Sequence, residues 1–190
     1  MAVFDPGAVT VLGLDRDGVP LTHGRVYGYS PADIAHIAQR CATLRLGPST
    51  AIFEPGHLRA LLAYHRAGRL PAGAYVKLYF SAGRSVFGLP ATTASLDVYL
   101  ELFGEAADEL AWGVAVLGGD VVETGLAQAA IERGGHVRVG LEDHRSARQP
   151  SNAELVAEVA ALAAAHGRTP ATPAEAAAIL GLPVRSSSGT

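Results

Sequence analysis

The segment GGHVRVGLEDH at residues 134–144 concentrates the side chains that could do chemistry. Arg138 stands inside an apolar, strand-like run, and Glu142 and Asp143 stand at its end. Side chains alternate along a strand, so Arg138 and Glu142 share one polar face, about 13 Å apart at roughly 3.3 Å per residue. A buried guanidinium needs an anionic partner. Two interpretations stay open: a structural ion pair that closes the interior, or a carboxylate that binds a metal or moves a proton.

Alternating strands and helices must position this segment. Short apolar runs predict five strands, at 8–14, 50–55, 74–81, 111–117 and 136–143. Helical periodicity and capping signals, among them Ser30-Pro31 and the pair Ser151 and Glu154, predict the helices between and after them. These helices cover residues 31–46, 56–70, 92–104, 121–134, 151–167 and 172–180.

This alternation predicts βα units and a parallel sheet. Five such units fit an open doubly wound sheet or a part of an eight-stranded barrel. No G-x-G-x-x-G follows the first strand and no Walker-type loop is present, so a dinucleotide or P-loop site has no support. We predict one α/β domain over 1–190, a partial TIM barrel of about five βα units, with a disordered tail at 183–190. A complete barrel has about 250 residues, so roughly three units are missing.

Composition narrows the class of partner. The formal net charge is −3 and the few cations are scattered, so we expect neither a nucleic-acid nor a membrane partner. No basic segment precedes a long apolar run at the N-terminus, and no apolar stretch approaches the roughly 20 residues of a membrane span. The expectation is a cytoplasmic protein. Its one cysteine, Cys41, is predicted to be a small core residue on a helix.

Several segments together resemble the beta-keto acid cleavage enzymes, including the 3-keto-5-aminohexanoate cleavage type of lysine degradation. They are GGHVRVGLED, SPADIAHIAQR, IFEPGHLRALLAYHRAGRL, the C-terminal SNAELV and GRTPATPAEAAAILGL, and Trp112, itself predicted to be core. The resemblance covers nearly the whole chain and implies an enzyme, a TIM-barrel acyltransferase that uses a divalent metal, usually Zn²⁺, and acetyl-CoA. A beta-keto acid and acetyl-CoA would give acetoacetate and a new acyl-CoA.

By position, the resemblance assigns Glu142 as a metal ligand, Asp143 as the general base and Arg138 as the arginine paired with that base. Zinc would polarise a carbonyl oxygen, and the arginine would keep the aspartate ionised and oriented. The loop after the fourth strand is expected to meet the cofactor, because Gly118 and Gly119 permit a close approach to an anion. Asp120 opposes an anion there and can cap the next helix instead.

The chain departs from the family pattern at three places. The two histidine ligands of the family form an H-x-H pair on an early strand, and this chain has no H-x-H. Its five strands correspond to the fourth through eighth of the barrel. His144 replaces the usual asparagine and is either a loop histidine or a partial ligand. Ala51 stands where relatives often carry a carboxylate, which makes an amino-bearing keto acid a poorer substrate.

Other residues keep more than one interpretation. The chain's only lysine, Lys77, is a paired or snorkelling residue, or an interior lysine near the thioester; a Schiff-base mechanism would have to use it. His57 faces either the pocket or the helix surface. For the whole chain, the alternatives to an enzyme are a degenerate relative without activity, or an acyl-CoA-binding module. An open barrel exposes strand edges and apolar inner faces, so we expect a homo-oligomer.

Overall fold

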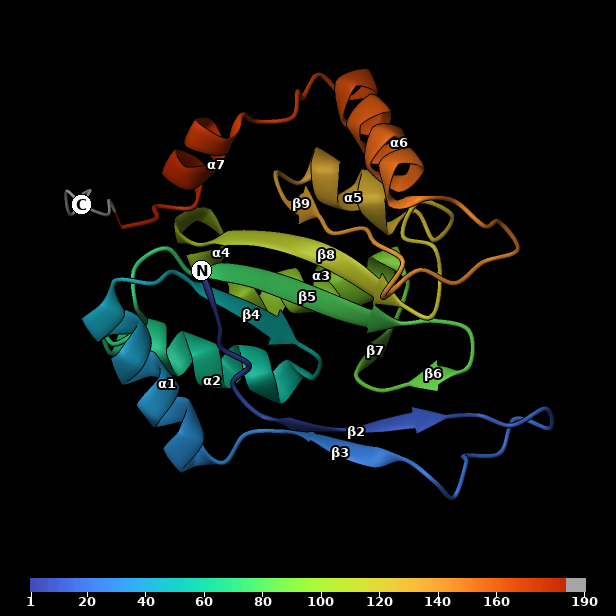
Figure 1. The fold of residues 1–190 in the computed structure, drawn as a ribbon, viewed down its shortest axis with the longest axis horizontal. Coiled ribbons are helices and arrows are strands. Elements are labelled where there is room, and N and C mark those ends of the chain that lie inside the picture. The colour runs from blue at the N-terminus through green and yellow to red at the C-terminus, as the bar shows by residue number, and fades with distance from the viewer. Residues whose placement is uncertain (184–190) are drawn as a thin grey trace, which may run out of the picture.

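A computed structural model describes residues 1–183 as a larger and a smaller β-sheet with helices packed against the larger one (Figure 1). The larger sheet consists of β1 (Ala2–Val3), β4 (Pro48–Ile52), β5 (Tyr75–Ser81), β7 (Leu89–Pro90), β8 (Ala111–Leu117) and β9 (His136–Val137). The smaller sheet consists of β2 (Ala8–Gly13), β3 (Arg25–Gly28) and β6 (Ser85–Val86). The helices are α1 (Pro31–Leu44), α2 (Pro55–Arg66), α3 (Thr93–Phe103), α4 (Ala106–Glu109), α5 (Leu126–Glu132), α6 (Asn152–Ala165) and α7 (Pro173–Ile179).

The main sheet has the strand order of a barrel segment. Its order is β1-β4-β5-β8-β9, every neighbouring pair is parallel, and each of these strands lies beside the next one along the chain. A doubly wound sheet would reverse direction at a switch point, and this order does not. The prediction of a partial α/β barrel is therefore confirmed. The barrel is not closed: β1 and β9 are the two edges of the sheet within the described residues.

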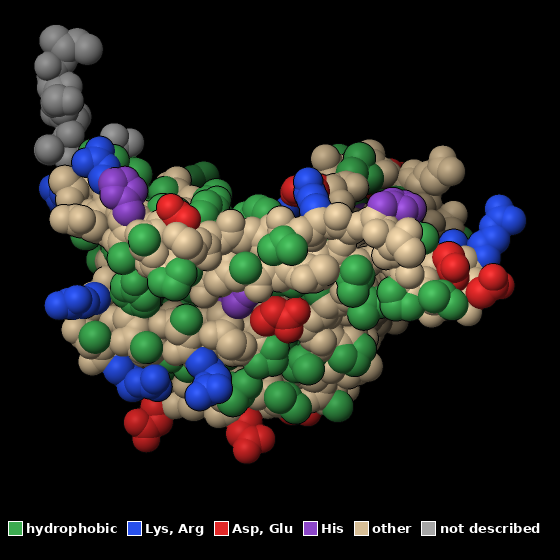
Figure 2. Space-filling view, turned by 90° about the horizontal axis from the view of Figure 1, so that it is seen from below, with side chains coloured by type: hydrophobic (Ala, Val, Ile, Leu, Met, Phe, Trp, Pro, Cys, Tyr) green, Lys and Arg blue, Asp and Glu red, His purple; other side chains and the backbone are tan. Residues whose placement is uncertain are grey.

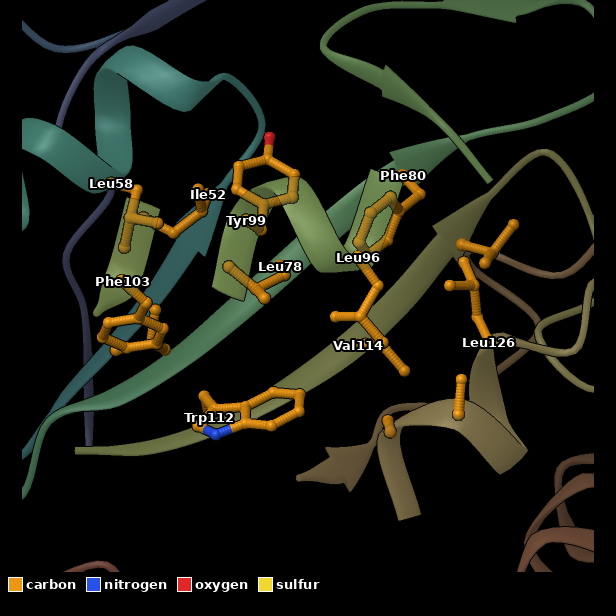
Figure 3. Packing of buried hydrophobic residues seen from close by; sticks show 14 of the residues in the cluster. Ile52, Leu58, Leu78, Phe80, Leu96, Tyr99, Phe103, Trp112, Val114 and Leu126 are labelled. Atoms are coloured by element: carbon orange, nitrogen blue, oxygen red, sulfur yellow. The ribbon is translucent and has the colours of Figure 1, made fainter. Parts of the chain in front are cut away.

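The helices cover one face of this sheet with an apolar core (Figure 3). Leu78 and Phe80 of β5 and Val114 of β8 are fully buried. They pack against fully buried side chains of the covering helices, namely Leu58, Leu61, Leu96, Tyr99 and Leu126. Each such burial stabilises the fold by about 1.5–3 kcal/mol. Trp112 belongs to the same cluster, which confirms it as a core residue.

The predicted helix starts are confirmed by reciprocal capping. The Ser30 hydroxyl accepts from the Asp33 N–H while the Asp33 carboxylate accepts from the Ser30 N–H, and Ser151 and Glu154 repeat this arrangement at α6. Each capping bond satisfies an N–H that the first helical turn leaves unpaired. Cys41 is buried on α1, also as predicted.

The strand predicted at 8–14 belongs to the other sheet, and this corrects its role. Residues 8–13 form β2, which pairs antiparallel with β3 over Ala8–Val11 and with β6 further on. The first parallel strand is the two-residue β1 instead. The β2–β3 hairpin lies over the inner face of the main sheet, where Val9 packs with Ala51 and Tyr79. Its alternating valines fit an amphipathic covering strand as well as a barrel strand.

His57 holds the base of this hairpin. Its Nε2 donates to the carbonyl oxygen of Ala8 at 3.1 Å, and the ring is buried. A Cβ added at Gly7 would lie 2.2 Å from the imidazole, so only glycine fits there. The histidine thus lies under the hairpin, and the prediction of a pocket-facing or surface position is wrong. The reason is that α2 presents this side to the hairpin rather than to solvent.

Other predicted boundaries shifted at turns. The helix predicted at 92–104 is α3, followed by the separate one-turn α4, and the helix predicted at 121–134 shortens to α5 after a turn over 121–124. The predicted tail 183–190 lies outside the described residues apart from Pro183.

Among the described helices, none has the length and hydropathy needed to cross a membrane. On the face shown in Figure 2, acidic and basic side chains are spread over the surface between hydrophobic and uncharged areas.

Candidate active site

The predicted strand 136–143 is interrupted, and the interruption brings its charges together. β9 ends at Val137, although the Arg138 N–H still donates to the Val114 oxygen at 2.9 Å. The chain then turns, with the N–H groups of Asp143 and His144 both donating to the oxygen of Gly140. The 13 Å separation expected for an extended strand is therefore wrong: Arg138 Nη2 donates to Glu142 Oε2 at 2.5 Å.

Arg138 also binds the second carboxylate. Its Nε donates to Asp143 Oδ2 at 2.6 Å, and its guanidinium carbon lies 5.8 Å from the centre of the Tyr79 ring. Burial lowers the pKa of Arg138, but the hydrogen bond to Asp143 and the proximity of Tyr79 outweigh it, so the net shift is upward. The arginine is thus a permanent cation that pairs with both carboxylates.

The two carboxylates differ in exposure. The Asp143 side chain is 7% exposed, whereas that of Glu142 is 79% exposed. Asp143 Oδ1 accepts no hydrogen bond from residues 1–183. One oxygen of Asp143 is therefore held by the arginine while the other is available to take a proton, which is the geometry of a positioned general base.

Asp143, Glu142 and Arg138 border a cavity of about 330 Å³ between the main sheet and the β2–β3 hairpin. This volume is in the range of small-molecule sites. The floor comes from inner-face positions of the parallel strands, and the opposite wall comes from the hairpin. The other lining residues are Val3, Asp5, Val9, Val11, Arg25, Tyr27, Ala51, Phe53, Lys77, Tyr79 and Leu117.

Asp5 is a lining residue that the sequence did not single out. Its Oδ1 accepts from the Ala51 N–H at 2.7 Å, and its Oδ2 accepts from the Tyr27 hydroxyl at 2.6 Å. Burial and then this carboxylate raise the pKa of Tyr27. The signal in the sequence was Asp-Pro-Gly after the apolar MAVF, which marks the carboxyl end of a very short strand. Tyr79, two residues after Lys77, could have been found by strand alternation.

Gly118 and Gly119, predicted to approach the cofactor, have a packing reason here. A Cβ at Gly118 would lie 2.6 Å from the Ser85 hydroxyl oxygen, and one at Gly119 would lie 2.6 Å from the Cβ of Ala82. The Gly118 N–H donates to the main-chain carbonyl oxygen of Asp143 at 2.9 Å, so it is not free to bind an anion. The glycines therefore let the 82–85 loop close onto β8, and their contact with a cofactor stays a prediction.

Asp120 and His144 form a separate cluster. Asp120 Oδ1 accepts from the N–H groups of Val122 and Glu123, so it caps the turn before α5 rather than α5 itself. Asp120 Oδ2 accepts from Arg148, and His144 Nδ1 lies 3.8 Å from the same oxygen. His144 Nε2 contacts the Ser146 hydroxyl at 3.1 Å. The imidazole is thus a loop residue engaged with Asp120, which favours that interpretation over a metal ligand.

The donor set does not complete a zinc site. Within residues 1–183, no group of three His, Cys, Asp or Glu side chains is gathered as metal ligands. Glu142 is the one exposed carboxylate at the cavity, and Asp143 is already paired with Arg138. Zinc usually takes at least three protein ligands, so the described residues supply one part of such a site at most.

Comparison with known proteins identifies the family. The sequence profile for "beta-keto acid cleavage enzyme" matches residues 1–182. The chain belongs to the beta-keto acid cleavage enzyme family. It is 30% identical over 163 residues to 3-oxoadipate:acetyl-CoA acetyltransferase of Cupriavidus necator, covering 84% of this chain and 56% of that protein. It is 39% identical over 99 residues to 3-keto-5-aminohexanoate cleavage enzyme of Acetoanaerobium sticklandii, covering 50% of this chain and 34% of that protein.

The chain spans about half the length of the family members it matches. The 3-keto-5-aminohexanoate cleavage enzyme of Fusobacterium nucleatum is 33% identical over 140 residues, covering 71% of this chain and 47% of that protein. A solved structure described as a ternary complex of ObcA with a C4-CoA adduct and oxalate superposes with a TM-score of 0.65 at 17% identity. It covers 96% of this chain and 45% of that one, which supports the shared fold.

Proposed function

We propose that this chain contributes the general base and its paired arginine to a beta-keto acid cleavage reaction. In that reaction a beta-keto acid and acetyl-CoA give acetoacetate and a new acyl-CoA. The observation that carries the proposal is the contact of one arginine with two carboxylates at the edge of a 330 Å³ cavity. Membership of the family supports it.

Each of the three residues receives a role from its contacts. Asp143 Oδ1 would take the proton from the keto acid, because it is the oxygen that Arg138 leaves open. Arg138 would fix the direction of the carboxylate, since two hydrogen bonds from one planar guanidinium restrain both of its partners. Glu142 would face the substrate from the exposed side of the cavity.

Glu142 is the one described residue that we propose as a ligand for zinc. When bound, a divalent metal would polarise the carbonyl oxygen of the keto acid. Glu142 would supply one ligand, and the described residues do not gather the others. We therefore assign no step of the reaction to the metal.

Acetyl-CoA would approach from a second cavity on the other side of Glu142. This cavity measures about 430 Å³, and Gly118, Arg84 and Arg145 are among the residues that line it. The two guanidinium groups suit the phosphates of CoA, because arginine binds phosphate through paired N–H donors. Glu142 and Asp143 line both cavities, which would place the keto acid and the thioester on either side of the same carboxylates.

Product analysis tests the proposal. The purified protein, with and without added Zn²⁺, is mixed with acetyl-CoA and a series of beta-keto acids, and acyl-CoA products are detected by mass spectrometry. Acetoacetate and acyl-CoA should form in equal amounts. Arg138→Met should abolish this, whereas Asp108→Asn, a change of an exposed carboxylate on α4, should not. Absence of both products under all conditions would refute an activity of this chain.

Self-association is a second, separate proposal. A groove of about 300 Å³ lies between β9, α6 and α7, with Val139 and Ala160 among its residues. Val156 and Ile179 border it with more than half of their surfaces exposed. We propose that a second copy covers this edge of the sheet. Light scattering coupled to size-exclusion chromatography should give twice the 19.6 kDa mass. A monomer at all concentrations would contradict it.

The cytoplasmic location and the role in lysine degradation stay predictions.

A further inference from the structure

The chain's only lysine occupies the inner face of the sheet beside the proposed site. Lys77 lies in the middle of β5, paired in register with Ala51 of β4 and Gly113 of β8. It is half-buried and lines the same 330 Å³ cavity as Asp143. Its neighbours across the sheet carry a methyl group and no side chain. Ala51 leaves space beside Lys77 on one side, whereas on the other side the Tyr75 hydroxyl occupies the space over Gly113, 2.3 Å from where a Cβ would lie.

Lys77 has neither a hydrogen bond nor an ion pair with any of residues 1–183. Four of the other charged groups around the cavity already have partners within the described residues. Arg138 binds Glu142 and Asp143, while the two oxygens of Asp5 are held by Tyr27 and the Ala51 N–H. A half-buried cation without a partner is unfavourable, and an anion supplied by a ligand would relieve this.

The pKa of Lys77 reflects this environment. Burial and then Arg138 lower it, against the opposing effects of Asp5, Asp143 and Glu142. Arg25, which lines the same cavity from the hairpin, is exposed and makes no ion pair within the described residues. The cavity thus contains two cations available to a ligand, one on its floor and one on its wall.

Lys77 lies further from the carboxyl ends of the strands than the proposed base Asp143 does. Lys77, Gly113 and His136 form one layer of paired residues, and Tyr79 and Arg138 lie two residues nearer the carboxyl ends. Two residues of strand correspond to roughly 7 Å. Asp143 is hydrogen-bonded to Arg138 and therefore lies near the layer of Tyr79 and Arg138, not near that of Lys77. A keto acid whose α-carbon meets Asp143 would therefore direct the far end of its acyl chain toward Lys77.

From this placement we infer that Lys77 binds a second carboxylate, so that the preferred substrate is a beta-keto acid with a carboxylate at both ends. The inference rests on the proposed function for the orientation of the substrate. The ammonium group would form a charge-assisted hydrogen bond with the distal carboxylate. Ala51 leaves room for that group and places no opposing charge beside it.

Binding of unreactive acids tests the inference without any turnover. Adipate and hexanoate have the same length and differ in one terminal carboxylate. By calorimetry, the unchanged protein should bind adipate about tenfold or more tightly than hexanoate, as expected for one charged hydrogen bond. Lys77→Met should remove that preference, and Lys77→Arg should keep most of it. Equal binding of both acids by the unchanged protein, or a preference that survives Lys77→Met, would overturn the inference.

Turnover separates this inference from the proposed function. If 3-oxoadipate and 3-oxohexanoate both react, Lys77→Met should reduce kcat/KM only for 3-oxoadipate and should leave the KM for acetyl-CoA unchanged. An equal loss for both acids, or a raised acetyl-CoA KM, would assign Lys77 to another group and refute the inference. If neither acid reacts but adipate selectivity depends on Lys77, the proposed function fails and the carboxylate site stands. A mass increase at Lys77 after borohydride treatment with 3-oxoadipate would show a Schiff base and refute a purely electrostatic role.

Discussion

Two arginines of this chain each bind a buried aspartate and at least one more exposed glutamate, in different surroundings. Arg138 binds Asp143 and Glu142 beside a cavity of about 330 Å³. Arg148 binds Asp120, whose side chain is 1% exposed, and contacts Glu158 at 3.0 Å. The cavity that Asp120 lines measures only about 10 Å³, which is room for no more than one water molecule, and Arg138 and Asp143 border it from the other side.

The difference lies in what the aspartates have left to bind. Asp120 accepts two backbone N–H groups and an arginine, so both of its oxygens are engaged within the fold. Asp143 uses one oxygen and keeps the other toward open space. An arginine–aspartate pair is therefore fully used for packing at Asp120, whereas at Asp143 it leaves one carboxylate oxygen available for reaction. Substitutions at the two aspartates should accordingly affect different quantities.

The largest effect is expected at Asp143. Asp143→Asn keeps the shape and the contact with Arg138 but removes the charge that would take a proton, so turnover should fall by about 10²- to 10⁴-fold. The melting temperature should change little, because Glu142 still pairs with Arg138. Steady-state kinetics and thermal melts measure the two quantities. Full activity in Asp143→Asn would show that this aspartate is not the base, and the exposed Asp108→Asn is the matched control.

A smaller effect, on stability, is expected at Asp120. Asp120→Ala leaves the N–H groups of Val122 and Glu123 without their acceptor, which should lower the free energy of unfolding by about 1–2 kcal/mol. Urea unfolding measures this change. Glu158→Gln, which removes the charge of a partly exposed partner of Arg148 and leaves the backbone contacts of Asp120 intact, should have a smaller effect. If Asp120→Ala unfolds at the same urea concentration as the unchanged protein, the cluster is not structural and the comparison fails.

The smallest expected effect is a pH dependence of the stability difference between the unchanged protein and Asp120→Ala. Burial raises the pKa of Asp120, but the hydrogen bonds from Arg148, Val122 and Glu123 outweigh it, so the pKa is lowered on folding. A lowered pKa stabilises the fold above the unfolded value of about 3.9 and ceases to do so as the pH falls through the folded value. The stability gap between the unchanged protein and Asp120→Ala should therefore narrow from about pH 5 to about pH 3. A constant gap would mean that the charge of Asp120 contributes nothing.

Much of the fold followed from local patterns. The βα alternation predicted the parallel sheet, and the capping residues at Ser30 and Ser151 predicted two helix starts, because caps act within one turn of chain. The prediction failed for residues 8–14. Their alternation of apolar and polar residues is shared by a covering hairpin and a barrel strand, and only the partner across the sheet distinguishes them. The two residues of β1 were too short to carry a pattern at all.

For the site, the sequence by itself determined which residues are charged within 136–143 and that they lie near the end of a parallel strand. Only the tertiary structure decided that they touch. The turn at Gly140 replaces an extended separation by direct contact. Its two ends are held by long-range backbone hydrogen bonds, from the Arg138 N–H to Val114 of β8 and from the Gly118 N–H to the Asp143 carbonyl oxygen, which no local pattern predicts. The fold also brings Asp5, Lys77 and the hairpin to one cavity, because neighbouring parallel strands collect residues that are distant along the chain.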